Sequence, residues 1–201
     1  MTTDDRRQTT ADRRPPTDAP VTLAVEDVTF TYPAGAQALR GVSLRVAPGE
    51  AVAIVGENGA GKTTLVKHLN GLLKPTSGRV LVGEWDTREH TVARLAARVG
   101  YVFQNPDDQI VERTVADEVA FGPRRLGQTA AEQAANVAAA LEMVELSSEA
   151  KTHPYDLTAA QRKLITLASV LAMRTPVVIF DEPTMGQDAR GVGLIGRIID
   201  L

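Results

Sequence analysis

A glycine-rich phosphate-binding loop constrains the fold of this chain more than any other feature. Residues 56–63 match the pattern G-x-x-x-x-G-K-[ST], and they follow an apolar run at residues 50–55. The residues after the loop carry leucines at helical spacing. A strand, a tight turn and a helix N-terminus together direct backbone N–H groups and a positive dipole end at one anion. The sequence therefore predicts an α/β fold in which a buried strand at residues 50–55 and a helix at residues 63–72 hold a nucleoside triphosphate.

The residues of the phosphate loop have separate expected roles. The glycines allow the backbone to approach phosphate oxygens without a clash from a Cβ atom. Lys62 brings a positive charge to the β- and γ-phosphates, and the Thr63 hydroxyl is a candidate Mg²⁺ ligand. The expected nucleotide contacts in this segment are Gly56, Glu57, Asn58, Gly59, Ala60, Gly61, Lys62, Thr63 and Thr64.

The composition limits the classes of protein to which the chain can belong. Of its 201 residues, 43% are hydrophobic and 23% are charged, which is ordinary for one globular domain. The net charge is −3, so no nucleic-acid partner is expected. Since the sequence has no cysteine, disulfides and thiolate metal sites are excluded. The longest apolar run, residues 164–173, is shorter than the about 20 residues of a membrane span. Any work at a membrane would therefore be that of a peripheral subunit.

Changes in pattern divide the chain into regions. Residues 1–20 are polar and charged, which predicts a disordered tail. From residue 21 onward, apolar and polar residues alternate as they do in strands. Residues 105–157 have a helix-favouring composition and are interpreted as a helical lobe inserted between core strands. Thr158 is then a candidate N-cap for a helix that runs to Met173.

A second acidic site follows a short apolar run. Residues 177–180 are four consecutive apolar residues, and Asp181 and Glu182 come directly after them. In an α/β sheet, the carboxyl end of such a strand lies beside the phosphate loop. We assign Asp181 to Mg²⁺ and Glu182 to the attacking water, because a carboxylate can orient or deprotonate water.

Further motifs resemble those of the ATP-binding cassette (ABC) ATPases, in an order that matches nearly all of residues 21–188. Tyr32 resembles the aromatic residue that stacks on adenine. Gln104, which follows a predicted strand, is similar to the glutamine that contacts Mg²⁺ and the attacking water. Residues 157–161 read L-T-A-A-Q in the place of the signature L-S-G-G-Q. The nucleotide contacts that this resemblance implies are Thr158, Ala159, Ala160 and Gln161.

The resemblance implies a P-loop NTPase core of ABC ATPase type with an antiparallel β subdomain and the inserted helical lobe. It implies ATP and Mg²⁺ as cofactors, and a second ABC ATPase domain, identical or different, whose signature completes each site. Residues 103–110 and 115–123 are also similar to the ATPases of energy-coupling factor importers, which take up vitamins or transition-metal ions. The expected partners are therefore transmembrane importer subunits, with this chain at the cytoplasmic face of the cell membrane.

Two departures from the family pattern leave alternatives open. The methyl groups of Ala159 and Ala160 are expected to hinder close approach to phosphate and to disfavour positive φ. The family also has a histidine after the catalytic glutamate, whereas every histidine here precedes Glu182. Residues 21–201 are accordingly expected to be a C-terminally truncated ABC domain that is inactive alone. The alternatives are a hydrolysis-poor partner cassette and a soluble ABC ATPase outside transport.

Overall fold

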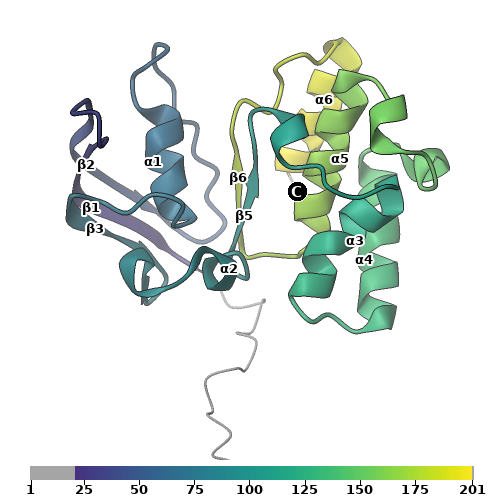
Figure 1. Cartoon of the computed structure of the whole chain (residues 1–201), viewed down its shortest axis with the longest axis horizontal. Helices are drawn as coiled ribbons and strands as arrows, with labels where there is room; N and C mark the ends of the chain where they lie inside the picture. The colour runs from purple at the N-terminus through teal and green to yellow at the C-terminus, as the bar shows by residue number, and fades with distance from the viewer. Residues whose placement is uncertain (1–20, 201) are drawn as a thin grey trace, which may run out of the picture.

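The computed structural model describes residues 21–200, which form two lobes on either side of a short parallel sheet (Figure 1). The lobe at the left of the view contains an antiparallel sheet and helix α1 (Lys62–Leu69). The lobe at the right contains the helices α3 (Val115–Arg125), α4 (Ala130–Met143), α5 (Ala159–Ala172) and α6 (Ala189–Ile199). This mixture of strands and helices confirms the predicted α/β class. The predicted tail at residues 1–20 lies outside the described residues.

The antiparallel sheet has four strands in the order β2-β1-β3-β4. They are β1 (Leu23–Thr31), β2 (Gln37–Val46), β3 (Ser77–Val82) and β4 (Trp85–Asp86). The central strand β1 pairs with β2 on one side and with β3 on the other. In β3, the alternate residues Val80 and Val82 are buried, as expected for a strand with one face on a core. In β1, Val25 and Val28 are both buried, because a register shift between them changes the alternation.

The prediction of a strand at residues 50–55 is wrong. This segment has no regular secondary structure, and its apolar residues Val52, Ile54 and Val55 are 43%, 37% and 87% exposed. Within residues 21–200, no strand pairs with the segment. An apolar sequence becomes a buried strand only where neighbouring strands satisfy its backbone groups, and that condition is not met here.

Helix α1 (Lys62–Leu69) follows the phosphate loop but is shorter than predicted. Gly71 has a φ of 75° and donates its N–H to the carbonyl of His68. A glycine in this left-handed conformation is a common way to end a helix. Leu72, which the sequence placed on the helix, is therefore in the turn beyond it and is exposed.

The helical lobe contains α5 and α6 in addition to the inserted residues 105–157, and it is built from capped helices. Its elements are α3 (Val115–Arg125), α4 (Ala130–Met143), α5 (Ala159–Ala172) and α6 (Ala189–Ile199), with short 3-10 turns at η2 (Pro106–Asp108), η3 (Ser147–Glu149) and η4 (Pro154–Asp156). The hydroxyls of Thr114, Thr129 and Thr158 accept backbone N–H groups at the starts of α3, α4 and α5. Such caps satisfy donors that the helix itself leaves free. Within residues 21–200, no helix is both long enough and apolar enough to cross a bilayer.

Two parallel strands, β5 (Val99–Val102) and β6 (Val177–Phe180), lie between the lobes (Figure 1). All four residues of β5 are buried. Val99 and Tyr101 belong to the core of the antiparallel sheet and α1, whereas Val102 belongs to the core of the helical lobe. Strand β5 is thus covered on both faces, and its carboxyl end is held at a fixed place between the lobes.

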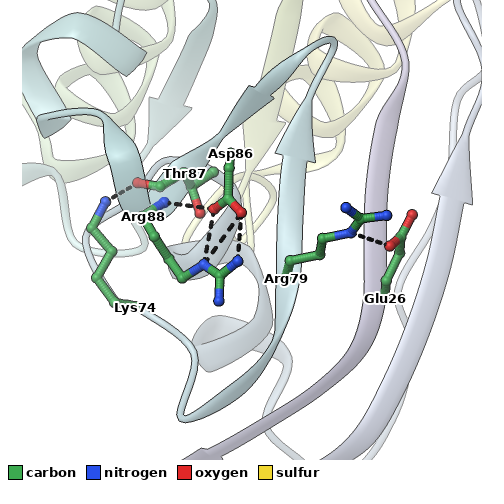
Figure 2. Close-up of polar contacts among 6 residues, drawn as sticks. All are labelled: Glu26, Lys74, Arg79, Asp86, Thr87 and Arg88. Atoms are coloured by element: carbon green, nitrogen blue, oxygen red, sulfur yellow. Dashed lines mark hydrogen bonds and ion pairs between the residues drawn. The ribbon is translucent and has the colours of Figure 1, made fainter.

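Polar contacts fasten the edge of the antiparallel sheet to the chain that leaves α1 (Figure 2). The Lys74 ammonium donates to the carbonyl of Thr87 in η1 (Thr87–Glu89) and to that of His90, the latter at 3.0 Å. Asp86 pairs with the guanidinium of Arg88 at 2.6 Å. Helix α2 (Val92–Leu95) follows at once. The Arg88 side chain is 48% exposed, so its ion pair with Asp86 contributes little stability, about 0–1 kcal/mol.

Candidate nucleotide site

The phosphate loop has the backbone conformation that an anion site requires. Gly59 and Gly61 have φ values of 83° and 92°, which side chains disfavour. A Cβ atom on Gly61 would lie 2.7 Å from the carbonyl oxygen of Ala38, so only glycine fits there. Gly61 is the N-cap of α1, and no side chain caps this helix start. Its first N–H groups are therefore available to a phosphate.

Lys62 lies over the same loop. Its ammonium donates to the carbonyls of Gly56 at 2.7 Å and Glu57 at 2.9 Å. The side chain thus joins the start of the loop to the start of α1. An ammonium has three donors, so a phosphate oxygen at the loop can accept a hydrogen bond from Lys62 as well.

Asp181 brings the phosphate loop and β6 together. Its carboxylate is buried, with the residue 8% exposed, and it accepts a hydrogen bond from the Thr63 hydroxyl at 3.2 Å. Neighbouring ligands of an octahedral Mg²⁺ ion, each about 2.1 Å from the metal, are about 3 Å apart. The two oxygens therefore fit adjacent positions around Mg²⁺. One or two protein ligands suffice for this ion, because it keeps several waters.

Tyr101 was not predicted to belong to the site. Its hydroxyl donates to the second oxygen of Asp181 at 2.7 Å. Burial and this contact with Asp181 both raise the pKa of the phenol, so Tyr101 stays a donor. The hydrogen bond fixes the rotation of the carboxylate. One signal in the sequence was available, because Tyr101 lies in β5, the strand that precedes Gln104. A tyrosine in an apolar strand is, however, commonly a core residue.

Glu182 and Gln104 lie together at the ends of the two parallel strands. The Gln104 side-chain amide donates to the Glu182 carboxylate at 2.9 Å. Glu182 has a φ of 49°, a left-handed conformation that costs a residue with a Cβ atom about 1–2 kcal/mol. Such strain persists only where the surrounding structure enforces it. In this conformation the Glu182 side chain meets the amide of Gln104.

Tyr32 lies beside the first turn of α1. It directly follows β1, and its hydroxyl is 2.9 Å from that of Thr64, with either atom able to donate. Phe30 packs edge to face against the Tyr32 ring, with centroids 4.9 Å apart. Tyr32 as a whole is 37% exposed. The residue is thus partly open to solvent beside the first turn of α1.

The signature residues form a surface of their own at the start of α5. Thr158 and Gln161 make a reciprocal capping box. Ala159 and Ala160 are the first two residues of the helix and have no positive φ, so the backbone at these positions does not require glycine. The expected cost of positive φ therefore does not arise. Within residues 21–200, no hydrogen bond or ion pair joins residues 158–161 to the phosphate loop.

The structure thus brings together most of the predicted residues and leaves the signature apart. Thr63 contacts Asp181, Gln104 contacts Glu182, and Tyr32 contacts Thr64. Together with the start of α1, which no side chain caps, these contacts make a site with backbone donors on one side and oxygen ligands on the other. Such an arrangement can hold a phosphorylated ligand, a hard cation and a water molecule.

Comparison with known proteins identifies the family. A model of the ABC transporter family matches residues 39–185. The energy-coupling factor transporter ATP-binding protein EcfA of Methanothermobacter thermautotrophicus is 42% identical over 88% of this chain and 58% of that protein. Other relatives, 39–46% identical, have names of ABC transporter ATP-binding proteins. The chain spans 31%, 68% and 58% of the length of the first three curated relatives.

Solved structures agree with this match and confirm the ABC ATPase type of fold. CbiO1 from Clostridium perfringens, described as part of the ABC transporter complex cbiONQ, has a TM-score of 0.78 at 33% identity, over 90% of this chain and 75% of that one. A dimeric ATP-binding cassette with bound ADP and phosphate has a TM-score of 0.79 at 27% identity, over 88% and 81%. The chain therefore belongs to the ABC transporter family, whose ATP-binding domains it resembles in both sequence and fold.

Proposed function

We propose that this chain binds ATP with Mg²⁺ and hydrolyses it to drive a membrane importer of the energy-coupling factor type, which takes up a vitamin or a transition-metal ion. One observation carries the proposal. Residues far apart in sequence converge at the phosphate loop, with Thr63 on Asp181 and Gln104 on Glu182. A polar set of this composition at an open helix start suits phosphoryl transfer to water.

Each residue of the site has a distinct task in this proposal. Lys62 and the N–H groups of α1 bind the β- and γ-phosphates, and the Tyr32 ring stacks on adenine. Thr63 and Asp181 hold Mg²⁺, with Gln104 as a further contact, and the ion neutralises charge on the phosphates when it is bound. Glu182 orients the attacking water and accepts its proton. The Gln104 amide holds the Glu182 carboxylate in place for that step.

The proposed partners follow from the place of the signature and from the relatives. Because the signature is not joined to the phosphate loop, we assign it to the nucleotide of a second ATPase domain, identical or different. The similarity to a dimeric cassette supports this assignment. Similarity to EcfA and to cbiO1 supports transmembrane importer subunits as the other partners, with this chain at the cytoplasmic face of the membrane. Residues 21–201 would be the ABC domain, with a helical lobe at about 105–157.

A second function, that of a hydrolysis-poor partner cassette, is favoured by the signature alone. Ala159 is exposed at the start of α5, so its methyl group lies on the surface that would meet the opposite nucleotide. A methyl group there hinders close approach of a phosphate to the helix start. This function differs from the first in turnover and not in nucleotide binding.

Purification of the protein from membranes, with its bound partners, tests the proposal. We expect apolar multi-span subunits to copurify, and the complex to hydrolyse ATP only with Mg²⁺ present. Copurification with ribosomes or nucleic acid would contradict the transport function. A complex that binds ATP and membrane subunits but does not hydrolyse ATP would favour the hydrolysis-poor function.

A further inference from the structure

A buried lysine lies directly behind the proposed catalytic pair. Lys163, in the first half of α5, is only 3% exposed, although lysine is rarely buried. It lies on the same face of α5 as the core residues Leu167 and Val170. Taking an ammonium group out of water is costly unless its donors are satisfied. The position of Lys163 therefore calls for specific partners.

The partners of Lys163 are three backbone carbonyls. The ammonium donates to Phe103 at 2.7 Å, to Gln104 at 2.8 Å and to Asp181 at 3.4 Å. All three donors of the ammonium are thus used. The first two carbonyls belong to the segment that leaves β5, and the third belongs to the peptide group between Asp181 and Glu182. Lys163 therefore joins the ends of both parallel strands where the catalytic pair leaves them.

The charges around Lys163 agree with this placement. Burial lowers the pKa of the ammonium, whereas the carboxylates of Asp181 and Glu182 raise it. The nearby acidic groups of the site thus help to keep a cation in an apolar setting. A neutral side chain of the same length would fill the space but would leave the three carbonyls without this donor.

Two more contacts hold residues 103–109, here called the Gln104 segment, on α5. Arg162 pairs with Asp107 at 2.9 Å. The Gln109 side chain accepts the N–H of Phe103 at 3.1 Å and donates to the carbonyl of Thr166 at 3.3 Å. Neither contact reaches β6. Among the described contacts of α5 with the Gln104 segment, only those of Lys163 include Asp181 as well.

We propose that Lys163 is a positioning residue, which sets the distance between the Gln104 amide and the Glu182 carboxylate by holding the backbone of both. The proposal rests on the proposed function of this pair in hydrolysis. Lys163 is on the helix that begins with the signature, and its ammonium contacts the backbone beside both Gln104 and Glu182.

The kinetic test compares two variants of Lys163 in the complete complex. Lys163→Met keeps much of the volume and removes the donors, whereas Lys163→Arg keeps donors and charge. We expect Lys163→Met to lower kcat by about 10²-fold, the usual scale for a misplaced catalytic group, with KM for ATP nearly unchanged because the phosphate loop is untouched. Lys163→Arg should recover much of the lost rate.

Ser169→Ala is the matched control. Ser169 is a buried polar residue of the same helix, and its hydroxyl donates only to the carbonyl of Ile165 at 2.9 Å. The control should leave kcat at the parental value, whatever its effect on the melting temperature. Equal loss of kcat in Ser169→Ala and Lys163→Met would overturn the proposal, as would a parental kcat in Lys163→Met.

Hydrogen exchange gives a second readout that needs no hydrolysis. The amides of Phe103 and Asp181 donate to Gln109 and to the carbonyl of Val102, each at 3.1 Å, so both are protected. Lys163→Met should speed exchange at both amides together, and Ser169→Ala at neither. Parental exchange at both in Lys163→Met would show that Lys163 does not hold these strand ends. If the parental complex lacks turnover, the proposed function fails, while exchange still decides whether Lys163 positions the pair.

Discussion

Two apolar segments of similar sequence reach different structures in this chain. Residues 50–55 and β6 both look like strands buried on two faces, and each leads directly into a functional segment. Strand β6 pairs in parallel with β5, and it ends at Asp181. Residues 50–55 pair with no strand among residues 21–200, and they are exposed. The difference shows that an apolar sequence specifies a strand only together with a partner, which is a property of the whole fold.

The largest loss of activity is expected from a substitution of Glu182, just beyond the end of the paired strand β6. Glu182→Gln keeps the shape of the side chain and its contact with Gln104 but removes the base, so we expect kcat in the complete complex to fall by about 10²–10⁴-fold. ATP binding should persist, because Lys62 and α1 are untouched. We therefore expect an ATPase assay to show little turnover and a binding assay to show that the variant still binds ATP. Parental turnover would show that another residue acts on the water.

The comparison between the two segments can be tested through stability. Ile179 of β6 is buried in the core, so Ile179→Ala should lower the free energy of unfolding by about 2–5 kcal/mol. Val55→Ala removes an exposed side chain, and it should change the same quantity by no more than about 0.5 kcal/mol. Urea unfolding of the 201-residue chain measures both. Similar losses in the two variants would mean that residues 50–55 are buried in solution.

Nucleotide affinity should depend on the phosphate loop, which follows the irregular segment, and on the first residue of α1. Lys62→Ala removes a charge-assisted hydrogen bond, worth about 1.5–3 kcal/mol, so the Kd for ATP should rise by about 10- to 100-fold. Lys67→Ala, on the same helix but beyond the loop, is the control and should leave affinity unchanged. Calorimetric titration measures both variants. An unchanged Kd in Lys62→Ala would exclude the loop as the phosphate site.

The smallest expected effect is at the edge of the antiparallel sheet, where Arg98 binds Glu84 through two hydrogen bonds of 2.6 and 3.0 Å. This contact lowers the pKa of the Glu84 carboxyl from 4.5 to about 2. A depressed carboxyl pKa adds stability that is present above pH 4.5 and is lost as the pH falls towards 2. The gain is small, because the side chain is 70% exposed.

Glu84→Gln should therefore reduce the loss of stability between pH 4.5 and pH 2, as measured by thermal unfolding in that range. Glu89→Gln, at an exposed position on η1, serves as the control and should keep the parental slope. A parental slope in Glu84→Gln as well would mean that the contact with Arg98 does not persist in solution.

Local signals in the sequence were sufficient for much of the fold. Thr158 begins α5 as a capping residue should, and the apolar run at residues 177–180 is strand β6. The rule that parallel strands end at one edge of a sheet placed Asp181 beside the phosphate loop, and Thr63 does contact it. The roles of these residues in catalysis stay predictions.

What the sequence did not predict depends on contacts between distant segments. Tyr101 and Lys163 look like an ordinary strand residue and a surface charge, because the partners that define them are at the ends of β5 and β6. The strand predicted at residues 50–55 is the converse case. Its apolar composition is that of a buried strand, but the sequence does not show whether a neighbouring strand is there to pair with it. The early end of α1 follows from the left-handed Gly71, which spacing alone did not reveal.

The double covering of β5 has a consequence for how the molecule unfolds. Its side chains enter both cores, with Tyr101 in one and Val102 in the other. Neither lobe can open without uncovering one face of this short strand, so we expect the two lobes to melt as one cooperative unit. Most of the helical lobe lies between β5 and β6 along the chain. Their pairing must therefore close a long loop and is expected to form late in folding.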